Sequence, residues 1–200
     1  MTGDDAASQP RRDFFRDSLA RMLGPLADLI EPRVAPPAVR WLRPPGAIDE
    51  SAFLDTCHRC GKCVEVCPAD AIVPLRVPGL PANNTPIIDA NETACVVCDG
   101  LQCTQVCPSG ALLPLTHPRQ INMGRAEVSA DLCLRRHGDD CTICADECPL
   151  GAEAITATHL GKPLVLDGCV GCGVCQQACP TRPRAIVVTP IRLLPGQTGR

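Results

Sequence analysis

The feature that most constrains this chain is a cysteine motif that occurs four times, numbered here motifs one to four in chain order. Motif one, residues 57–68, and motif four, residues 169–180, share the spacing C-x2-C-x2-C-x3-C-P. Motif two, residues 95–108, widens the middle gap to C-x4-C, and motif three, residues 133–149, widens the first gap to C-x7-C. The quartets are Cys57, Cys60, Cys63 and Cys67; Cys95, Cys98, Cys103 and Cys107; Cys133, Cys141, Cys144 and Cys148; and Cys169, Cys172, Cys175 and Cys179. They use all sixteen cysteines of the chain.

This spacing is typical of [4Fe–4S] cluster sites. Three closely spaced cysteines wrap a short loop around one face of an iron–sulfide cube, so that backbone N–H groups can point at the anionic cluster. The fourth cysteine leaves the site at a Cys-Pro step and, in two-cluster ferredoxins, ligates the other cluster. Gly61, Gly171 and Gly173 permit backbone angles in these loops that are closed to other residues. Sixteen thiolates therefore predict four [4Fe–4S] cubes as the cofactors.

Two other uses of the cysteines fit less well. Zinc sites usually take separated C-x2-C pairs, so structural zinc binding is a weak alternative. A disulfide scaffold leaves the fourfold repeat unexplained. Since no motif lacks a cysteine, no iron is left with an open position for a substrate, and the clusters indicate an electron carrier, not an enzyme. An assembly or maturation factor that binds an apo-enzyme is the alternative from another functional class.

The rest of the composition indicates protein partners. Three phenylalanines, one tryptophan and no tyrosine leave little for an aromatic core, so metal clusters must supply the bulk. The formal charge of −3 becomes about −11 when four cubes of about −2 each are added. Such a charge favours redox partners with basic patches and argues against nucleic acid. The sequence has no apolar run of about eighteen residues, so it predicts no transmembrane segment.

The motifs recur at a regular distance, with β-like segments around them. The first cysteines follow one another at intervals of 38, 38 and 36 residues. The β-like segments are residues 71–73, 86–89, 111–113, 126–129, 154–155, 164–167 and 185–188. This repeat predicts an α+β fold of tandem bacterial-ferredoxin-like modules, in which short antiparallel hairpins and short helices surround the clusters and regular secondary structure is sparse.

The chain divides into three predicted regions. Residues 1–46 form an N-terminal extension with an amphipathic helix over about residues 13–30 and a proline-rich linker after it. Residues 47–190 hold the four motifs, and residues 191–200 are a tail. The apolar positions of the helix recur at three- and four-residue steps: Phe15, Leu19, Met22, Leu26 and Leu29. This helix packs on its own domain, or it docks on a partner protein or a membrane surface.

The N-terminal region also bears on location. Arg11 and Arg12 resemble the start of a twin-arginine export signal. A working signal needs a following apolar stretch of about seven to fifteen residues, and here Arg21, Pro25 and Asp28 interrupt it. We therefore expect a cytoplasmic protein, with twin-arginine export to the periplasm as the alternative.

The residues around motifs one and four predict different cluster potentials. His58, Arg59 and Lys62 place positive charge near motif one and favour its reduced state. Motif four is flanked by apolar residues, among them Val170 and Val174. A buried, poorly solvated cluster there is harder to reduce.

Several segments resemble one protein family. They are residues 42–47, Phe53 before motif one, the C-x4-C gap of motif two, residues 121–124 and the C-x7-C gap of motif three. Over about residues 41–190 the chain resembles the NapG/MauM-type ferredoxins, which are associated with periplasmic nitrate reduction and methylamine use. More loosely, it resembles the four-cluster subunits of molybdenum oxidoreductases of the dimethyl-sulfoxide-reductase type. The resemblance implies an electron relay between a quinol-oxidising membrane partner and a terminal molybdenum reductase.

The resemblance also implies that the motifs are nested, with motif one exchanging its fourth cysteine with motif four and motif two with motif three. The implied cluster ligands are Cys57, Cys60, Cys63 and Cys179; Cys169, Cys172, Cys175 and Cys67; Cys95, Cys98, Cys103 and Cys148; and Cys133, Cys141, Cys144 and Cys107. Sequential pairing, one with two and three with four, is the alternative. It predicts that Cys67 lies in the same site as Cys95.

Overall fold

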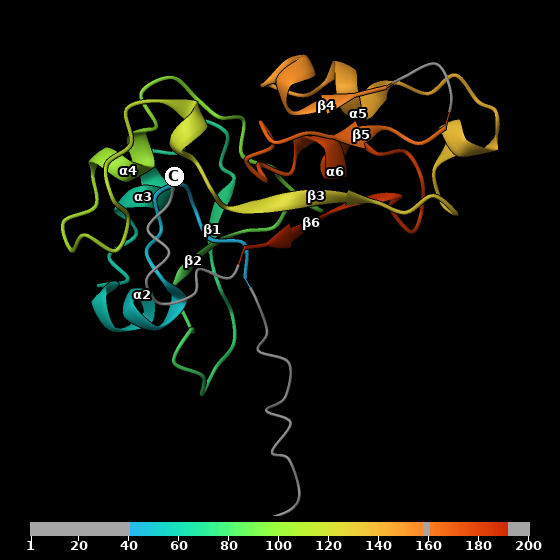
Figure 1. Cartoon of the computed structure of the whole chain (residues 1–200). Helices are drawn as coiled ribbons and strands as arrows, with labels where there is room; N and C mark the ends of the chain where they lie inside the picture. The colour runs from blue at the N-terminus through green and yellow to red at the C-terminus, as the bar shows by residue number, and fades with distance from the viewer. Residues whose placement is uncertain (1–40, 158–160, 192–200) are drawn as a thin grey trace, which may run out of the picture. The chain divides into compact units, whose positions relative to one another are not determined.

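The computed structural model describes residues 41–157 and 161–191, which contain only short regular elements (Figure 1). The helices are α2 (Glu50–Thr56), α3 (Lys62–Glu65), α4 (Gln102–Gln105), α5 (Ile143–Asp146) and α6 (Val174–Ala178), with 3-10 turns at Pro118–Gln120, Leu134–His137 and Gly151–Glu153. The strands are β1 (Ile72–Pro74), β2 (Pro86–Ile88), β3 (Gly124–Val128), β4 (Ile155–Thr156), β5 (Leu164–Val165) and β6 (Ile186–Pro190). No helix in these two ranges is long and apolar enough to span a membrane.

The strands pair in a pattern that occurs twice. Between motifs one and two, β1 and β2 form an antiparallel hairpin in which Ile72 faces Ile88. Between motifs three and four, β4 and β5 form an equivalent hairpin. The chain thus turns back on itself once between motifs one and two and once between motifs three and four. Each turn brings the end of one motif next to the start of the following one.

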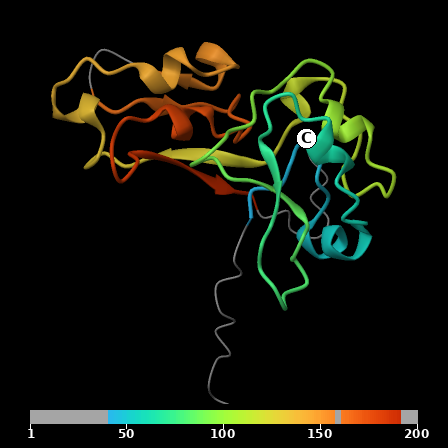
Figure 2. The same ribbon diagram turned by 180° about the vertical axis from the view of Figure 1, so that it is seen from behind.

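The outer segments of each pair also meet. β3, which precedes motif three, pairs antiparallel with β6, which follows motif four. The corresponding contact around motifs one and two is a single antiparallel bridge between Ala47 and Leu112. We call residues 41–115 the first half and residues 121–191 the second half; Figures 1 and 2 show their elements gathered on opposite sides of this folded part.

The core of the first half begins earlier than the sequence predicts. Leu42, Arg43, Pro44 and Pro45 are buried, and the Ile88 N–H donates to the Leu42 carbonyl at 2.8 Å. The linker predicted to run to residue 46 therefore ends before residue 42, because these residues cover the β1–β2 hairpin. The helix predicted over residues 13–30, the two arginines at 11 and 12, and the tail from residue 192 lie outside the described residues.

One aromatic ring anchors this core. Phe53 in α2 is 0% exposed, and the guanidinium of Arg43 stacks over its ring, 4.7 Å from the centroid. The same guanidinium bonds to Glu50 and, at 2.8 Å, to the hydroxyl of Thr85. A buried cation held in this way ties α2 to the residues before β2. Cys57, Cys63 and Cys107 pack against the same small cluster as Phe53.

The two halves are joined through α6. The Cys95 N–H donates to the Cys172 carbonyl at 3.0 Å. Gln176 is buried, and its Nε2 donates to Asn91 Oδ1 at 2.9 Å while its Oε1 accepts from the Val188 N–H at 2.7 Å. The bonds from Gln176 to Asn91 and from Cys95 to Cys172 cross the junction, so separating the halves leaves the Nε2 of the buried Gln176 without this partner.

All but one of the predicted β-like segments contribute to strands. Six of the seven contribute to strands, while residues 111–113 form only the bridge at Leu112. The α+β class and the sparse regular structure match the prediction. The sequence does not indicate which segments pair, and this pairing decides how the cysteines group.

Candidate iron–sulfur sites

The sixteen cysteines, all within the described residues and all free thiols, line four separate cavities. Site I contains Cys57, Cys60, Cys63 and Cys107; site II contains Cys67, Cys95, Cys98 and Cys103; site III contains Cys133, Cys141, Cys144 and Cys179; site IV contains Cys148, Cys169, Cys172 and Cys175. Each site thus takes three cysteines from one motif and the fourth from another.

This grouping contradicts the nested pairing and follows the sequential alternative. Cys67 of motif one lies with Cys95 of motif two, and Cys107 of motif two lies with the first three cysteines of motif one. Motifs three and four exchange Cys148 and Cys179 in the same way. The strand pairing explains this grouping. The β1–β2 and β4–β5 hairpins each bring a motif next to the motif that follows it directly in sequence.

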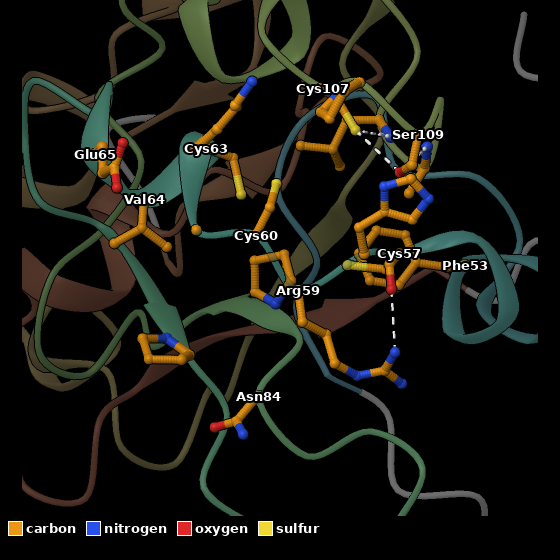
Figure 3. A pocket seen from close by; sticks show the side chains of 18 of the residues that line it. Phe53, Cys57, Arg59, Cys60, Cys63, Val64, Glu65, Asn84, Cys107 and Ser109 are labelled. Atoms are coloured by element: carbon orange, nitrogen blue, oxygen red, sulfur yellow. Dashed lines mark hydrogen bonds between the residues drawn. The ribbon is translucent and has the colours of Figure 1, made fainter.

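Site I lies above Phe53 at the surface of the first half. In Figure 3, Cys57, Cys60, Cys63 and Cys107 surround the cavity, whose volume is about 410 Å³. The pKa of the Cys63 thiol is raised to about 11, first by burial and then by the neighbouring thiols Cys57, Cys107 and Cys60. Thiols that raise one another's pKa in this way are close together, and a bound cation relieves their repulsion.

The fourth cysteines of motifs one and two accept backbone hydrogen bonds. The Ala71 N–H donates to Cys67 Sγ at 3.3 Å, and the Leu112 N–H donates to Cys107 Sγ at 3.4 Å. The pKa of Cys107 is lowered: burial raises it, but the Leu112 N–H and the hydroxyl of Ser109 outweigh burial. These donors stabilise a thiolate, which is the form that binds iron.

Cys179 has an equivalent environment in the second half. Its Sγ lies 3.2 Å from the Thr181 hydroxyl. Burial again raises its pKa, but this hydroxyl and nearby backbone N–H groups lower it overall. Sequence analysis missed Ser109 and Thr181; the pattern Cys-Pro-Ser or Cys-Pro-Thr, which places a hydroxyl two residues after the fourth cysteine, is the signal that identifies them.

Sites I, II and IV lie next to one another in that order. The pKa of Cys103 in site II is raised to about 12, first by burial, then by the other thiols of its site and by Cys63 of site I. The pKa of Cys172 in site IV is also raised to about 12, first by burial, with Cys95 of site II among the neighbouring charges. The hydrogen bond between the Cys95 N–H and the Cys172 carbonyl places sites II and IV on either side of the junction.

Site III follows site IV. The pKa of Cys175 in site IV is raised to about 12 by burial and by neighbouring thiols, including Cys144 of site III. The pKa of Cys144 is raised to about 11 by burial and by Cys141, Cys133 and Cys179 of its own site. The four sites therefore form a row in the order I, II, IV, III.

The donor sets fit iron–sulfur cubes. Within residues 41–157 and 161–191, no group of three or more His, Cys, Asp and Glu side chains is arranged to hold a single metal ion. The four thiols of each site surround a cavity, and ligands on four corners of a cube lie further apart than thiolates about 2.3 Å from one zinc ion. Four thiols with N–H donors to sulfur are the ligand set and environment of a [4Fe–4S] cluster.

Comparison with known proteins supports this assignment. Residues 56–111 match the model of a 4Fe–4S dicluster domain, and residues 166–182 match the model of a 4Fe–4S binding domain. The first match spans motifs one and two as one unit, in agreement with their shared sites I and II.

Similar proteins cover most of the chain. The ferredoxin-type protein NapG of Escherichia coli is 38% identical, over 94% of this chain and 89% of that protein. The methylamine utilization ferredoxin-type protein MauM is 39% identical both in Methylorubrum extorquens, over 80% of this chain and 77% of the relative, and in Methylobacillus flagellatus, over 96% and 88%. Identities of this size over nearly full length confirm the predicted resemblance. The chain therefore belongs to the NapG and MauM family of ferredoxin-type proteins, which are iron–sulfur electron carriers and not enzymes.

Proposed function

We propose that this protein is a polyferredoxin with four [4Fe–4S] clusters, one in each of sites I to IV. Single electrons pass along the row from an electron donor to a terminal oxidoreductase. The two halves act as tandem two-cluster modules, each with two clusters held by exchanged cysteines. The observation that carries the proposal is that every one of the sixteen thiols belongs to a set of four and that the sets are contiguous.

The clusters supply one-electron transfer when bound, and the surrounding residues prepare their sites. The N–H groups of Ala71 and Leu112 and the hydroxyl of Thr181 donate toward sulfur, which offsets the negative charge that each electron adds. Burial of Cys103 and Cys172 keeps water from the inner sites. Electrons cross from one half to the other between sites II and IV, where Cys95 and Cys172 are joined by a backbone hydrogen bond.

The partners proposed follow from the family. We take the donor to be a membrane quinol dehydrogenase and the acceptor a molybdenum reductase, since this is the relay that the resemblance implies. The negative charge of the loaded protein agrees with protein partners and not with nucleic acid. A maturation factor, by contrast, binds its apo-partner tightly, and its own redox turnover is slow.

Metal analysis tests the cluster count. We expect protein purified without oxygen to contain about sixteen irons and about sixteen sulfides per chain, with a broad visible absorption that bleaches on reduction. Iron far below this number, or a colourless protein, contradicts the proposal.

A single substitution tests the cysteine grouping. In Cys107→Ser, sequential pairing predicts the loss or weakening of the site I cluster. Iodoacetamide followed by mass spectrometry then labels Cys57, Cys60 and Cys63, and Cys133 stays protected. Nested pairing predicts labelling of Cys133, Cys141 and Cys144. The variant Glu127→Gln, which changes an exposed side chain of β3 and keeps all sixteen thiols, is the control.

A further inference from the structure

The four sites differ in what surrounds their openings. Cys60 of site I is the only exposed one of the sixteen cysteines, all of which the structure describes. Polar and charged residues also line this cavity: His58, Arg59, Lys62, Arg76 and Glu65. Among the described residues, the linings of sites II, III and IV contain no charged side chain. Site I, which is one end of the row, thus has a polar and mostly basic opening.

Two of the basic residues are held in place by hydrogen bonds to uncharged oxygens. Arg59 has a left-handed conformation with φ 55°, and its guanidinium donates to the carbonyls of Cys57 at 3.0 Å and Pro81 at 2.8 Å. Arg76 donates to Asn84 Oδ1 at 3.0 Å. These bonds engage carbonyl and amide oxygens, and no carboxylate of residues 41–157 or 161–191 forms an ion pair with either guanidinium.

Lys62 is available to a partner. It is exposed, it lies two residues after Cys60, and no hydrogen bond or ion pair joins its ammonium group to another described residue. An ammonium group that has no partner of its own can pair with a carboxylate of a docked protein. Lys62 lines the cavity of site I together with Cys60, so such a contact forms at the opening of this site.

A basic opening is distinctive on this molecule because the molecule as a whole is negative. The formal charge is −3, and four bound clusters bring it to about −11. A positive patch on a negative protein orients an approaching partner, since a partner with an acidic face is attracted there and repelled elsewhere.

We propose that site I is the port through which electrons enter or leave the row, and that its basic surface docks a redox protein with an acidic rim around its own redox centre. We call His58, Arg59, Lys62 and Arg76 the port surface. This proposal rests on the relay function. It further specifies which end of the row of sites contacts a partner and that this partner is acidic.

Stopped-flow kinetics with two protein probes tests the port. Reduced, fully loaded protein is mixed with oxidised flavodoxin, an acidic one-electron carrier, or with cytochrome c, a basic one. The variants are Lys62→Glu at site I and Lys162→Glu, which makes the same charge change next to Pro163 in the lining of site III. These are the two lysines of the chain, so they form a matched pair.

We expect Lys62→Glu to slow electron transfer to flavodoxin by about tenfold at low ionic strength and to flatten its salt dependence. Cytochrome c should react as fast or faster. A change in cluster potential alone shifts both rates in the same direction, so it cannot explain slower transfer to flavodoxin only. Lys162→Glu should change the flavodoxin rate by less than about twofold. These results together support the port.

Three results overturn the proposal. If neither variant changes the flavodoxin rate, the port surface does not steer partners. If Lys162→Glu has the larger effect, the port for acidic partners is at site III. The third result is protein that contains no clusters, which overturns both the relay and the port. Iron analysis before mixing identifies this case. Protein with its full iron content but unaltered rates overturns only the port.

Discussion

Motifs one and four have the same cysteine spacing but lie in opposite surroundings. Gly61 and Gly173 occupy the same place in them, and both have left-handed backbones, with φ 79° and 92°. A Cβ added at Gly61 meets nothing within 4 Å, whereas a Cβ at Gly173 lies 2.5 Å from the Cβ of Ala90 in the other half. Gly61 therefore serves only the turn, and Gly173 also allows the two halves to approach.

The third position of each motif repeats this contrast. Arg59 in motif one and Gly171 in motif four both have positive φ, 55° and 72°. A Cβ at Gly171 lies 2.4 Å from the backbone nitrogen of Gly124 at the start of β3, while Arg59 carries a long side chain at the surface. The same loop can be an exposed opening or an internal junction, and the packing around it decides which.

The largest expected effect separates the two glycines. Gly173→Ala combines left-handed strain with overlap against Ala90, and we expect it to lower the free energy of unfolding by about 4 kcal/mol. Gly61→Ala has only the strain and should cost about 1 kcal/mol. Denaturant unfolding of the anaerobic, iron-loaded proteins measures both. Equal losses would show that the close approach of the halves has no energetic consequence.

The junction provides the next test. Gln176→Leu leaves the Val188 N–H and the Asn91 side chain without their partners, so we expect a loss of about 2 kcal/mol. Gln102→Leu in α4 of the first half is the control, because Gln102 is exposed; it should change stability by less than about 0.5 kcal/mol. Unfolding curves followed by cluster absorbance check this. An unaffected Gln176→Leu variant would mean that the halves hold together without this bond.

Cluster loss should also distinguish the two motifs. Cys60 is exposed, whereas Cys172 and Cys175 are buried. During limited oxidation with a chelator present, we expect about four of the irons to leave at least about threefold faster than the rest, with Cys60 alkylated first. Timed iron release combined with mass spectrometry makes the measurement. Early labelling of Cys172 would reverse the comparison.

The smallest expected effect concerns potential. Lys62→Glu replaces a positive by a negative charge at the exposed opening of site I, and we expect the midpoint potential of that cluster to fall by roughly 30 mV, because solvent screens the change. Lys162→Glu should leave this midpoint unchanged. EPR-monitored redox titration of both variants is the measurement, and unchanged midpoints in Lys62→Glu would remove the role predicted for this charge.

Much of the fold and of the sites follows from short sequence patterns. The residue spacing within each quartet, the Cys-Pro steps and the β-like segments are local properties, and six of the seven segments contribute to strands. Ser109 and Thr181 were missed because the ferredoxin spacing covers the cysteines and the following proline but not the residue after it. The end of the linker was misplaced because prolines are compatible both with an extended linker and with the buried segment at Pro44 and Pro45.

The sequence by itself determined that the thiols come in four sets of four and that an electron-carrying iron–sulfur protein is built around them. Only the tertiary structure decided which set each fourth cysteine joins, because all four stand in the same Cys-Pro context and both pairings satisfy the spacing. The β1–β2 and β4–β5 hairpins settle the choice by returning the chain to the neighbouring motif. The tertiary structure likewise exposes site I and buries site IV, since exposure depends on what the rest of the chain packs against a loop and not on the loop's own residues.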